Sequence, residues 1–404
     1  MFYIIDYNAS LVHTHHSGLI KSFTDLLDNR NEEYEVFLPV GSRLDFSKIK
    51  GQTNYCLIPG GQTVEFEFKK LSSWFNSLIG KFYNSIPIEM RFFSFAWYKF
   101  LLILQSIVIG HSLRVVFKRI QATDNYNVKL LFPTACPVSF ALARKLEKKK
   151  FNCICYFRLT NTAENRGIFQ VLNDKYQFFE ETESYQFVKC KFGFEMEDYA
   201  NTFPLKSEFN HSPFPPRNHS QIQKSSQNIA CFLGMAQNHK GQNDLFEIVV
   251  ETLKLSDSGI SWIVQVNENT QDIFRSVKAN EGSLKVEIGF MNDDKMFEYL
   301  TQASLACLPY NIDYYQYNSS AFAYLCADYS VAVATFSGSA FAKEIDKFGI
   351  GITARTLGEI SHKINDFFEL KNAPFMNNIS EYNTYRKESN LVFLDLFNVD
   401  NHMN

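Results

Sequence analysis

The chain has 404 residues, which is more than one hydrophobic core ordinarily holds and predicts two domains of about 200 residues each. Apolar residues make up 46% of it, which is typical of a globular protein and argues against intrinsic disorder. A formal net charge of −3 provides no global basic field, so a nucleic-acid partner is not expected.

The N-terminal half begins with alternating strand and helix patterns. Residues 19–27 carry apolar side chains at helical spacing, and Ser17 and Gly18 stand just before them at a cap position. A second helix is expected over 137–148. Apolar runs predict strands at 2–6, 34–38, 55–58, 128–132, 151–157 and 186–190. Strands that alternate with helices in this way indicate a parallel α/β sheet.

Residues 60–126 interrupt this rhythm, and we expect them to form a helical insertion. Within it, residues 92–109 are strongly apolar and aromatic, with Lys99 inside the run. Basic residues flank it at Arg91, Arg114, Lys118 and Arg119, so the run and its basic end extend over 92–119. The uninterrupted apolar part is too short for a spanning helix. Two readings stay open: a buried helical hairpin, or a basic and aromatic surface that makes a peripheral contact with an anionic membrane.

The eight cysteines form no C-x-x-C pair, and most lie inside apolar strand or helix patterns. This usage predicts reduced, buried thiols in a cytoplasmic protein. The first ten residues have neither a basic leader nor a long apolar run, so we expect no signal peptide.

The C-terminal half repeats the alternation more clearly, after a proline-containing linker at 206–228. Asn243 or Asp244 is expected to cap one helix, and Asp293 or Asp294 another. Two more helices are expected at 356–370 and 379–397. Strands are predicted at 229–233, 262–266, 284–288, 305–309, 331–335 and 350–353. This half is therefore expected to be a doubly wound domain.

Two successive strand-to-helix junctions in this half are rich in small polar residues. The strand at 305–309 leads through a tyrosine-rich loop to Asn318, Ser319 and Ser320 before an apolar helix. The strand at 331–335 leads to residues 337–339, which read Ser-Gly-Ser, before another helix. A helix N-terminus offers free N–H groups and a positive dipole end, so each junction is a candidate site for an anion such as a diphosphate.

Three segments of the C-terminal half, in order and at fitting spacing, carry a family resemblance. They are "IACFLGMAQNHKGQNDLFEIVVETL", "VEIGFMNDDKMFEYLTQASLACLPY" and "YYQYNSSAFAYLCADYSVAVATFSGSAFAKEI". Together they resemble the GT-B-fold glycosyltransferases of retaining family 4. The resemblance implies two Rossmann-like doubly wound domains with a cleft between them. Residues 1–205 would be the acceptor-side domain and 229–404 the nucleotide-sugar domain, with the final helix packing back on the first domain.

The resemblance also implies roles for single residues. Lys240 and the backbone N–H groups of Ser319 and Ser320 would bind the donor diphosphate, with the serine hydroxyls assisting. Gly289 to Met291 would lie under the base, and Ser17 and Gly18 would close over the phosphates. The acceptor would be bordered by His16, Arg158, Thr160 and Asn161.

The chain departs from the family at several of these positions. Met235 stands where the family has Arg, and the family's Gly-x-Pro is replaced by "DYSVAV". The second glutamate of a family pair would fall at Tyr324 or Leu325, and the first near Gln316 or Tyr317, with Asp313 the nearest acid. Two functions therefore stay open: a glycosyltransferase acting on a glycan or lipid-linked acceptor, and a non-catalytic GT-B scaffold of a glycan assembly complex. The resemblance implies no metal and no cofactor beyond a nucleotide-sugar co-substrate, with UDP or GDP undecided.

Each candidate also has an ordinary structural explanation. Lys240 can be a surface lysine, and Ser319 and Ser320 can be helix caps without a ligand. The tyrosines at 310, 314, 315 and 317 can either pack in the core or stack on a sugar. His13, His15 and His16 lack the cysteine or carboxylate partners of a zinc site. Glu344, early in its helix, is expected at the surface.

Overall fold

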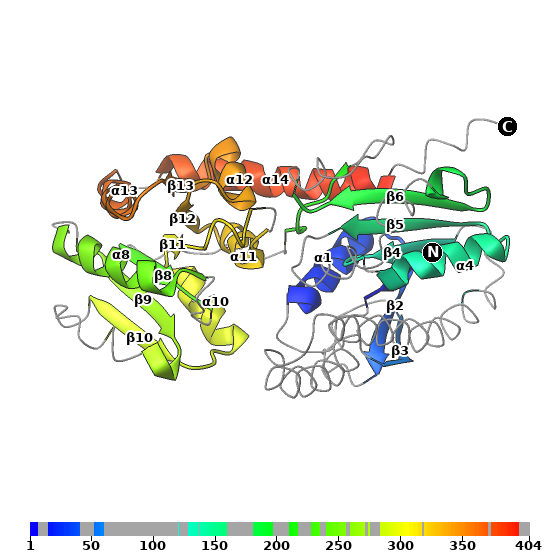
Figure 1. Cartoon of the computed structure of the whole chain (residues 1–404), viewed down its shortest axis with the longest axis horizontal. Helices are drawn as coiled ribbons and strands as arrows, with labels where there is room; N and C mark the ends of the chain where they lie inside the picture. The colour runs from blue at the N-terminus through cyan, green and yellow to red at the C-terminus, as the bar shows by residue number, and fades with distance from the viewer. Residues whose placement is uncertain are drawn as a thin grey trace, which may run out of the picture. The chain divides into compact units, whose positions relative to one another are not determined.

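The computed structural model (Figure 1) describes residues 1–6, 15–40, 52–59, 120, 128–135, 137–159, 181–196, 210–216, 228–234, 240–255, 259–270, 274, 283–316, 319–370 and 373–395. The chain divides into two compact units. The first consists of Met1–Phe194 and Phe203–Asn210, and the second of Glu195–Thr202 and His211–Asn404.

The first unit contains a sheet with the strand order β3-β2-β1-β4-β5-β6-β7. Its strands are β1 Phe2–Ile5, β2 Tyr34–Val40, β3 Gln52–Pro59, β4 Val128–Phe132, β5 Cys153–Leu159, β6 Val188–Phe194 and β7 Asn210–His211. The pairings from β3 to β6 are all parallel. Helix α1 spans His15–Asn29, and α4, Pro137–Lys148, packs against β5 and β6.

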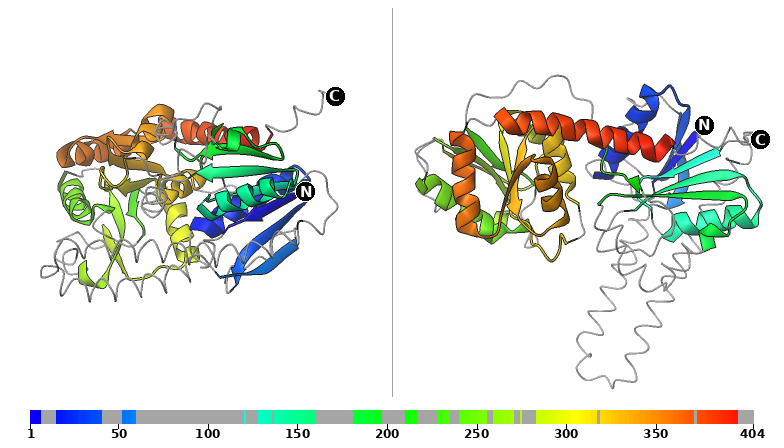
Figure 2. Two further views of the ribbon diagram at one scale, coloured as in Figure 1. Left: turned by 45° about the vertical axis from the view of Figure 1, so that its right-hand side comes forward. Right: turned by 90° about the horizontal axis from the view of Figure 1, so that it is seen from above.

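The second unit contains a parallel sheet with the order β10-β9-β8-β11-β12-β13. Its strands are β8 Ile229–Phe232, β9 Ser261–Val266, β10 Leu284–Ile288, β11 Leu305–Leu308, β12 Ala332–Phe336 and β13 Gly351–Ala354. Its helices are α8 Gln242–Leu255, α10 Asp293–Gln302, α11 Ala321–Asp328, α12 Ala340–Phe348, α13 Leu357–Glu369 and α14 Ala373–Asp395. Helices α8 and α13 pack on each other, while α14 runs past α11 and α12 (Figure 2).

Both units therefore show the strand order of a doubly wound fold, in which the chain starts in the middle of the sheet and reverses direction once. Strands β8 and β11 are buried along their whole length, as expected where helices cover both faces of a parallel sheet. The predicted fold class is confirmed.

Three expected helix starts were wrong. Helix α1 begins at His15, so Ser17 and Gly18 lie in its first turn rather than before it. Helix α8 begins at Gln242, so Asn243 and Asp244 also lie within a first turn. The N-cap of α10 is Asn292, whose side chain accepts a hydrogen bond from the Lys295 N–H at 2.9 Å. In each case the sequence has another polar or small residue one to three positions before the residue that we expected to cap the helix.

Part of the expected linker at 206–228 is packed in the second unit. Ser212 donates to Asn390 at 2.8 Å, and Asn390 donates to the Pro213 carbonyl at 2.9 Å. Arg386 donates through Nε to the Phe214 carbonyl at 2.8 Å. Helix α14 thus holds this segment, and its contact with the first unit stays a prediction. The expected insertion at 60–126 lies outside the described residues apart from Ile120.

The described cysteines are all free thiols, and all but the half-buried Cys190 are buried. The expected burial is therefore confirmed for five of these six cysteines. Within the described ranges, no helix combines the length and apolarity needed to cross a membrane.

Candidate functional site

Three helix N-termini meet the carboxyl edge of the second sheet. Strands β8, β11 and β12 are neighbours and run parallel, so their carboxyl ends lie along one edge. Each is followed along the chain by a helix, α8, α11 and α12 respectively. Ligands of open α/β sheets bind at this edge, and helix N-termini favour anions.

Gly241 brings the start of α8 against the end of β11. Its φ of +68° is in the left-handed region that glycine tolerates best. A Cβ at this position would lie only 1.7 Å from the Pro309 carbonyl oxygen. Only glycine fits such an approach, and it places the preceding residue, Lys240, beside the strand ends.

Lys240 is half-buried at this edge. Its Nζ lies 3.4 Å from where a Cβ of Gly234 would stand, so the ammonium reaches the turn that ends β8. Burial lowers the pKa of Lys240, and no carboxylate among the described residues offsets that effect. A half-buried cation without an anionic partner, close to a positive helix end, is a favourable place for a bound anion.

Ser320 is the N-cap of α11. It is buried, and its hydroxyl accepts from the Ala323 N–H at 3.2 Å. The expected cap role is therefore present. It leaves the N–H groups of Ala321 and Phe322 without a partner within the described part of the chain, and Ser319 is half-buried beside them.

The N-terminus of α12 is occupied by the chain itself. Ser339 caps it by accepting from the Ala342 N–H at 3.1 Å. The Ala340 N–H donates to the Tyr315 carbonyl at 3.1 Å. Of the two polar junctions singled out in the sequence, the one at α11 therefore has more free donors than the one at α12.

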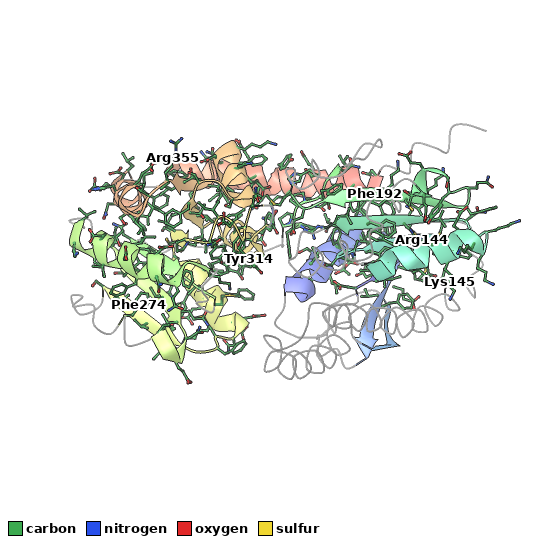
Figure 3. The ribbon with its side chains drawn as sticks, in the orientation of Figure 1. Arg144, Lys145, Phe192, Phe274, Tyr314 and Arg355 are labelled. Atoms are coloured by element: carbon green, nitrogen blue, oxygen red, sulfur yellow. The ribbon has the colours of Figure 1, made fainter. Side chains whose placement is uncertain are left out.

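The tyrosine-rich loop after β11 is largely a core element. Tyr310 and Tyr315 are buried and stack with ring centroids 4.6 Å apart, and both contact Phe341. Tyr314 is 40% exposed and is the described tyrosine of this loop that can reach a ligand (Figure 3). Tyr317 lies outside the described residues.

Gln265, near the end of β9, was missed in the sequence. Its Oε1 accepts from the Gly234 N–H at 2.7 Å, and its Nε2 donates to the Gly289 carbonyl at 2.8 Å. It thereby joins the turn after β8, which Lys240 reaches, to the segment from Gly289 to Met291. The signal in the sequence was one amide inside the apolar strand Trp-Ile-Val-Gln-Val.

In the first unit, the candidates are only partly described. Gly18 is buried in α1 and its carbonyl accepts from the Ser22 hydroxyl at 2.9 Å. The side chains of His16 and Ser17, and all of Thr160 and Asn161, lie outside the described residues. Arg158 is buried in β5, where its Nη1 donates to the Pro133 carbonyl at 3.3 Å. Its guanidinium thus ties together two strand ends, and an acceptor role stays a prediction.

Glu344 corrects a sequence expectation, because it is buried rather than at the surface. Burial raises its pKa to about 7, although Tyr382, Arg386 and Tyr324 act in the opposite direction. The side chain faces α14, and the sequence pattern of α12 alone gives no sign of that contact. Tyr324, one of the two positions at which the second family glutamate was expected, is 3% exposed and donates to Glu344 at 3.4 Å.

No cluster of three or more histidine, cysteine or acidic residues in the described ranges could hold a metal ion. The side chains of His13, His15 and His16 fall outside those ranges.

No protein-family profile matches the chain, and no curated protein matches it. Solved structures do. The N-terminal domain of Candida albicans trehalose-6-phosphate phosphatase has a TM-score of 0.60 at 11% identity, covering 98% of this chain and 96% of that one. A Burkholderia xenovorans α,α-trehalose-phosphate synthase in complex with glucose-6-phosphate has 0.59 at 10%, covering 98% of both chains. An E. coli trehalose-6-phosphate protein bound with UDP-2-fluoro glucose has 0.58 at 10%, also covering 98% of both. At such identities the likeness shows the fold, that of GT-B proteins with two Rossmann-like domains.

Proposed function

We propose that the chain is a glycosyltransferase that moves a sugar from a nucleotide-sugar to a glycan or lipid-linked acceptor, in cell-surface polysaccharide or glycolipid synthesis. The observation that carries the proposal is Lys240, a half-buried ammonium without a described carboxylate partner at the carboxyl edge of the sheet. The fold supports it, because a structure of the same fold is bound with UDP-2-fluoro glucose.

The donor diphosphate would lie between Lys240 and the start of α11. There it would accept from the N–H groups near Ser319 and Ser320 and from the Ser319 hydroxyl. The Ser320 hydroxyl is already used in capping, so its part would be to hold the helix end in place. The base would rest on Gly289 to Met291, where the ring of Phe290 is 67% accessible and would stack on it.

Chemistry at this site would depend on positioning and on charge. As the bond from sugar to diphosphate breaks, negative charge grows on the leaving phosphate, where Lys240 and the α11 donors stabilise it. This scheme uses no metal, and the sugar would be transferred with retention of configuration. Ser17 and Gly18 would close over the phosphates, and the acceptor would lie near His16, Arg158, Thr160 and Asn161. No residue is assigned as a catalytic acid, base or nucleophile.

A second candidate function is a non-catalytic GT-B scaffold of a glycan assembly complex. Tyr324 and Leu325 favour it, because the family glutamate was expected at one of these two positions and both hold buried residues without a carboxylate. Met235, in place of the family's arginine, removes a charge-assisted bond of roughly 1.5–3 kcal/mol from donor binding.

The protein is proposed to act in the cytoplasm, at the inner face of the membrane, through residues 92–119. Those residues lie outside the described ranges. Their basic and aromatic composition supports the proposal.

Thermal-shift measurements with UDP, GDP and their sugar conjugates test donor binding. At least one should raise the melting temperature of the wild type, since a ligand that binds the folded state stabilises it. Lys240→Ala should abolish the shift. Lys254→Ala is the matched control, because Lys254 lies at the far end of α8 and is exposed and paired with Glu251. No shift with any nucleotide would exclude donor binding. Sugar transfer by the purified wild type, lost in Lys240→Ala, would exclude the scaffold.

A further inference from the structure

Gln265 is a buried amide in an otherwise apolar strand. It is 4% exposed, and its neighbours Val264 and Val266 are fully buried. A primary amide in such surroundings costs free energy unless its polar atoms are hydrogen-bonded. Both are: the oxygen receives the Gly234 N–H and the nitrogen donates to the Gly289 carbonyl.

The two partners also determine the orientation of the amide. A backbone N–H can only donate and a carbonyl can only accept, so Oε1 must face Gly234 and Nε2 must face Gly289. Both glycines have positive φ, +110° at Gly234 and +78° at Gly289. Each stands where a strand gives way to a turn, so without a tie these positions have wide conformational freedom.

Strand β9 lies between β8 and β10, so one side chain from it can reach the ends of both. The turn after β8 is the one that Lys240 approaches, and the segment after β10 begins with Gly289 and Phe290. Gly289 is tied twice to β9, because its N–H also donates to the Val266 carbonyl at 2.9 Å. Gly234 is held to β9 at this point by the side chain of Gln265.

We propose that Gln265 is a positioning residue that holds the phosphate side and the base side of the nucleotide site at a fixed separation. The inference rests on the proposed function. A nucleoside diphosphate would touch both ends of this tie, whereas pyrophosphate or a nucleoside would touch one. Prearranging two parts of a site favours the ligand that uses both of them.

The test compares Gln265→Leu, which removes both hydrogen bonds at similar size, with Gln265→Glu, which keeps only the acceptor for Gly234. Thr252→Val is the control, since Thr252 accepts from the Trp262 Nε1 at 3.0 Å near the opposite end of β9. Calorimetric titration measures binding of the best nucleoside diphosphate, of pyrophosphate and of the nucleoside. Amide hydrogen exchange follows Gly234 and Gly289.

Gln265→Leu should weaken binding of the nucleoside diphosphate about tenfold and binding of pyrophosphate or the nucleoside less than about threefold. One net hydrogen bond changes an affinity by no more than about tenfold. Exchange at Gly234 should be faster in Gln265→Leu and unchanged in Gln265→Glu and Thr252→Val. If Gln265→Leu does not fold, Gln265→Glu carries the test, with preferential weakening of the nucleoside diphosphate relative to pyrophosphate, because the introduced carboxylate repels both anions.

If Gln265 has a purely structural role, Gln265→Leu should lower the melting temperature and weaken the binding of all three ligands by the same factor. That result would overturn the proposal. A wild type that binds no nucleoside diphosphate would instead refute the proposed function before any variant is compared, and the positioning role with it. Faster exchange at Gly234 in Gln265→Leu would then show only that the Gln265 side chain stabilises the fold.

Discussion

The Nε2 atom of His211 lies 3.8 Å from the Oε1 atom of Glu344 inside the second unit. The same Nε2 is 3.0 Å from the Glu195 carbonyl, and Nδ1 is 2.7 Å from the Tyr385 hydroxyl. A carbonyl only accepts, so Nε2 carries a proton in this arrangement and donates it to the Glu195 carbonyl. Among the residues that the structure describes, the Glu344 Oε1 has no hydrogen-bond partner, which makes the charged carboxylate unfavourable here.

Glu344→Gln should remove a pH dependence of stability. The pKa of Glu344 rises from 4.5 to about 7 on folding, chiefly through burial, so the folded state holds this proton more tightly than the unfolded state. The resulting stability is fully present below pH 4.5 and is lost as the pH rises to 7. At pH 8 the variant should be more stable than the wild type by up to about 3 kcal/mol. Urea unfolding at pH 5 and pH 8 measures this.

Glu359→Gln is the control for that experiment. Glu359 is exposed and its pKa is lowered, first by the hydrogen bond from Lys363, so its contribution has the opposite sign. Glu359→Gln should therefore not raise the free energy of unfolding at pH 8. If the free energy of unfolding changed equally with pH in the wild type and in Glu344→Gln, the raised pKa of Glu344 would be contradicted.

Arg386→Leu should destabilise the second unit strongly. Arg386 is fully buried, and its Nη1 lies 2.8 Å from Asp328 Oδ1 while Nε holds the Phe214 carbonyl. Removing one partner of a buried pair leaves the other charge uncompensated, at a cost of about 3–5 kcal/mol. Chemical denaturation measures the loss. Lys254→Ala breaks an exposed pair and should cost less than about 1 kcal/mol. Similar losses in both variants would refute the argument.

Gly241→Ala and Gly259→Ala separate backbone strain from steric conflict. Both glycines have similar positive φ, +68° and +64°. At Gly259 a Cβ would meet nothing within 4 Å, so that variant should lose only about 1–2 kcal/mol. At Gly241 the Pro309 carbonyl must move, so the loss should be larger and Lys240 should be displaced. Equal unfolding midpoints for the two variants would show that this contact is easily relaxed.

Ser320→Ala and Thr356→Ala compare two helix caps. Ser320 caps α11, and Thr356 caps α13 by accepting from the Glu359 N–H at 3.2 Å. Removing either capping hydroxyl should lower the free energy of unfolding by about 1 kcal/mol. Only Ser320→Ala is expected to weaken nucleotide binding as well, because α11 follows β11, the strand whose end Gly241 approaches, whereas α13 follows β13, two strands further along the sheet. Thermal melts with and without nucleotide distinguish the two effects, and an equal ligand shift in both variants would count against a site at α11.

The basic end of residues 92–119 should bind anionic vesicles if the surface reading is right. Each basic residue near such a membrane contributes about 1 kcal/mol, so changing Arg114, Lys118 and Arg119 to Ser should release the protein. Binding should weaken with salt, because exposed charges are screened within about 10 Å at 0.1 M. Cosedimentation across a salt series measures it. Absence of binding at any salt would favour the buried hairpin instead.

Local pattern was enough to predict most of the architecture. The strands at 128–132 and 284–288 were placed to the residue. The first is an apolar run whose burial the sequence reports directly, whereas the second is marked by alternating apolar residues and has no buried residue. The alternation of strands and helices then predicted doubly wound units, and three spaced segments indicated a GT-B fold. Ser320 was picked out because a serine at a helix start has a local physical rationale, and Lys240 because the family resemblance implied a phosphate role for it.

The remaining features depend on partners far away in the chain. Glu344 looked like a surface residue, yet Tyr324 and Arg386 bury it from two other helices. Gln265 looked like an isolated polar residue, but it joins turns 31 and 24 residues away. The helix caps were misplaced for a similar reason, since several neighbouring side chains can cap and the path of the chain selects one. Periodicity records whether a side chain is buried, whereas the groups that it meets are set by how separate strands and helices pack together.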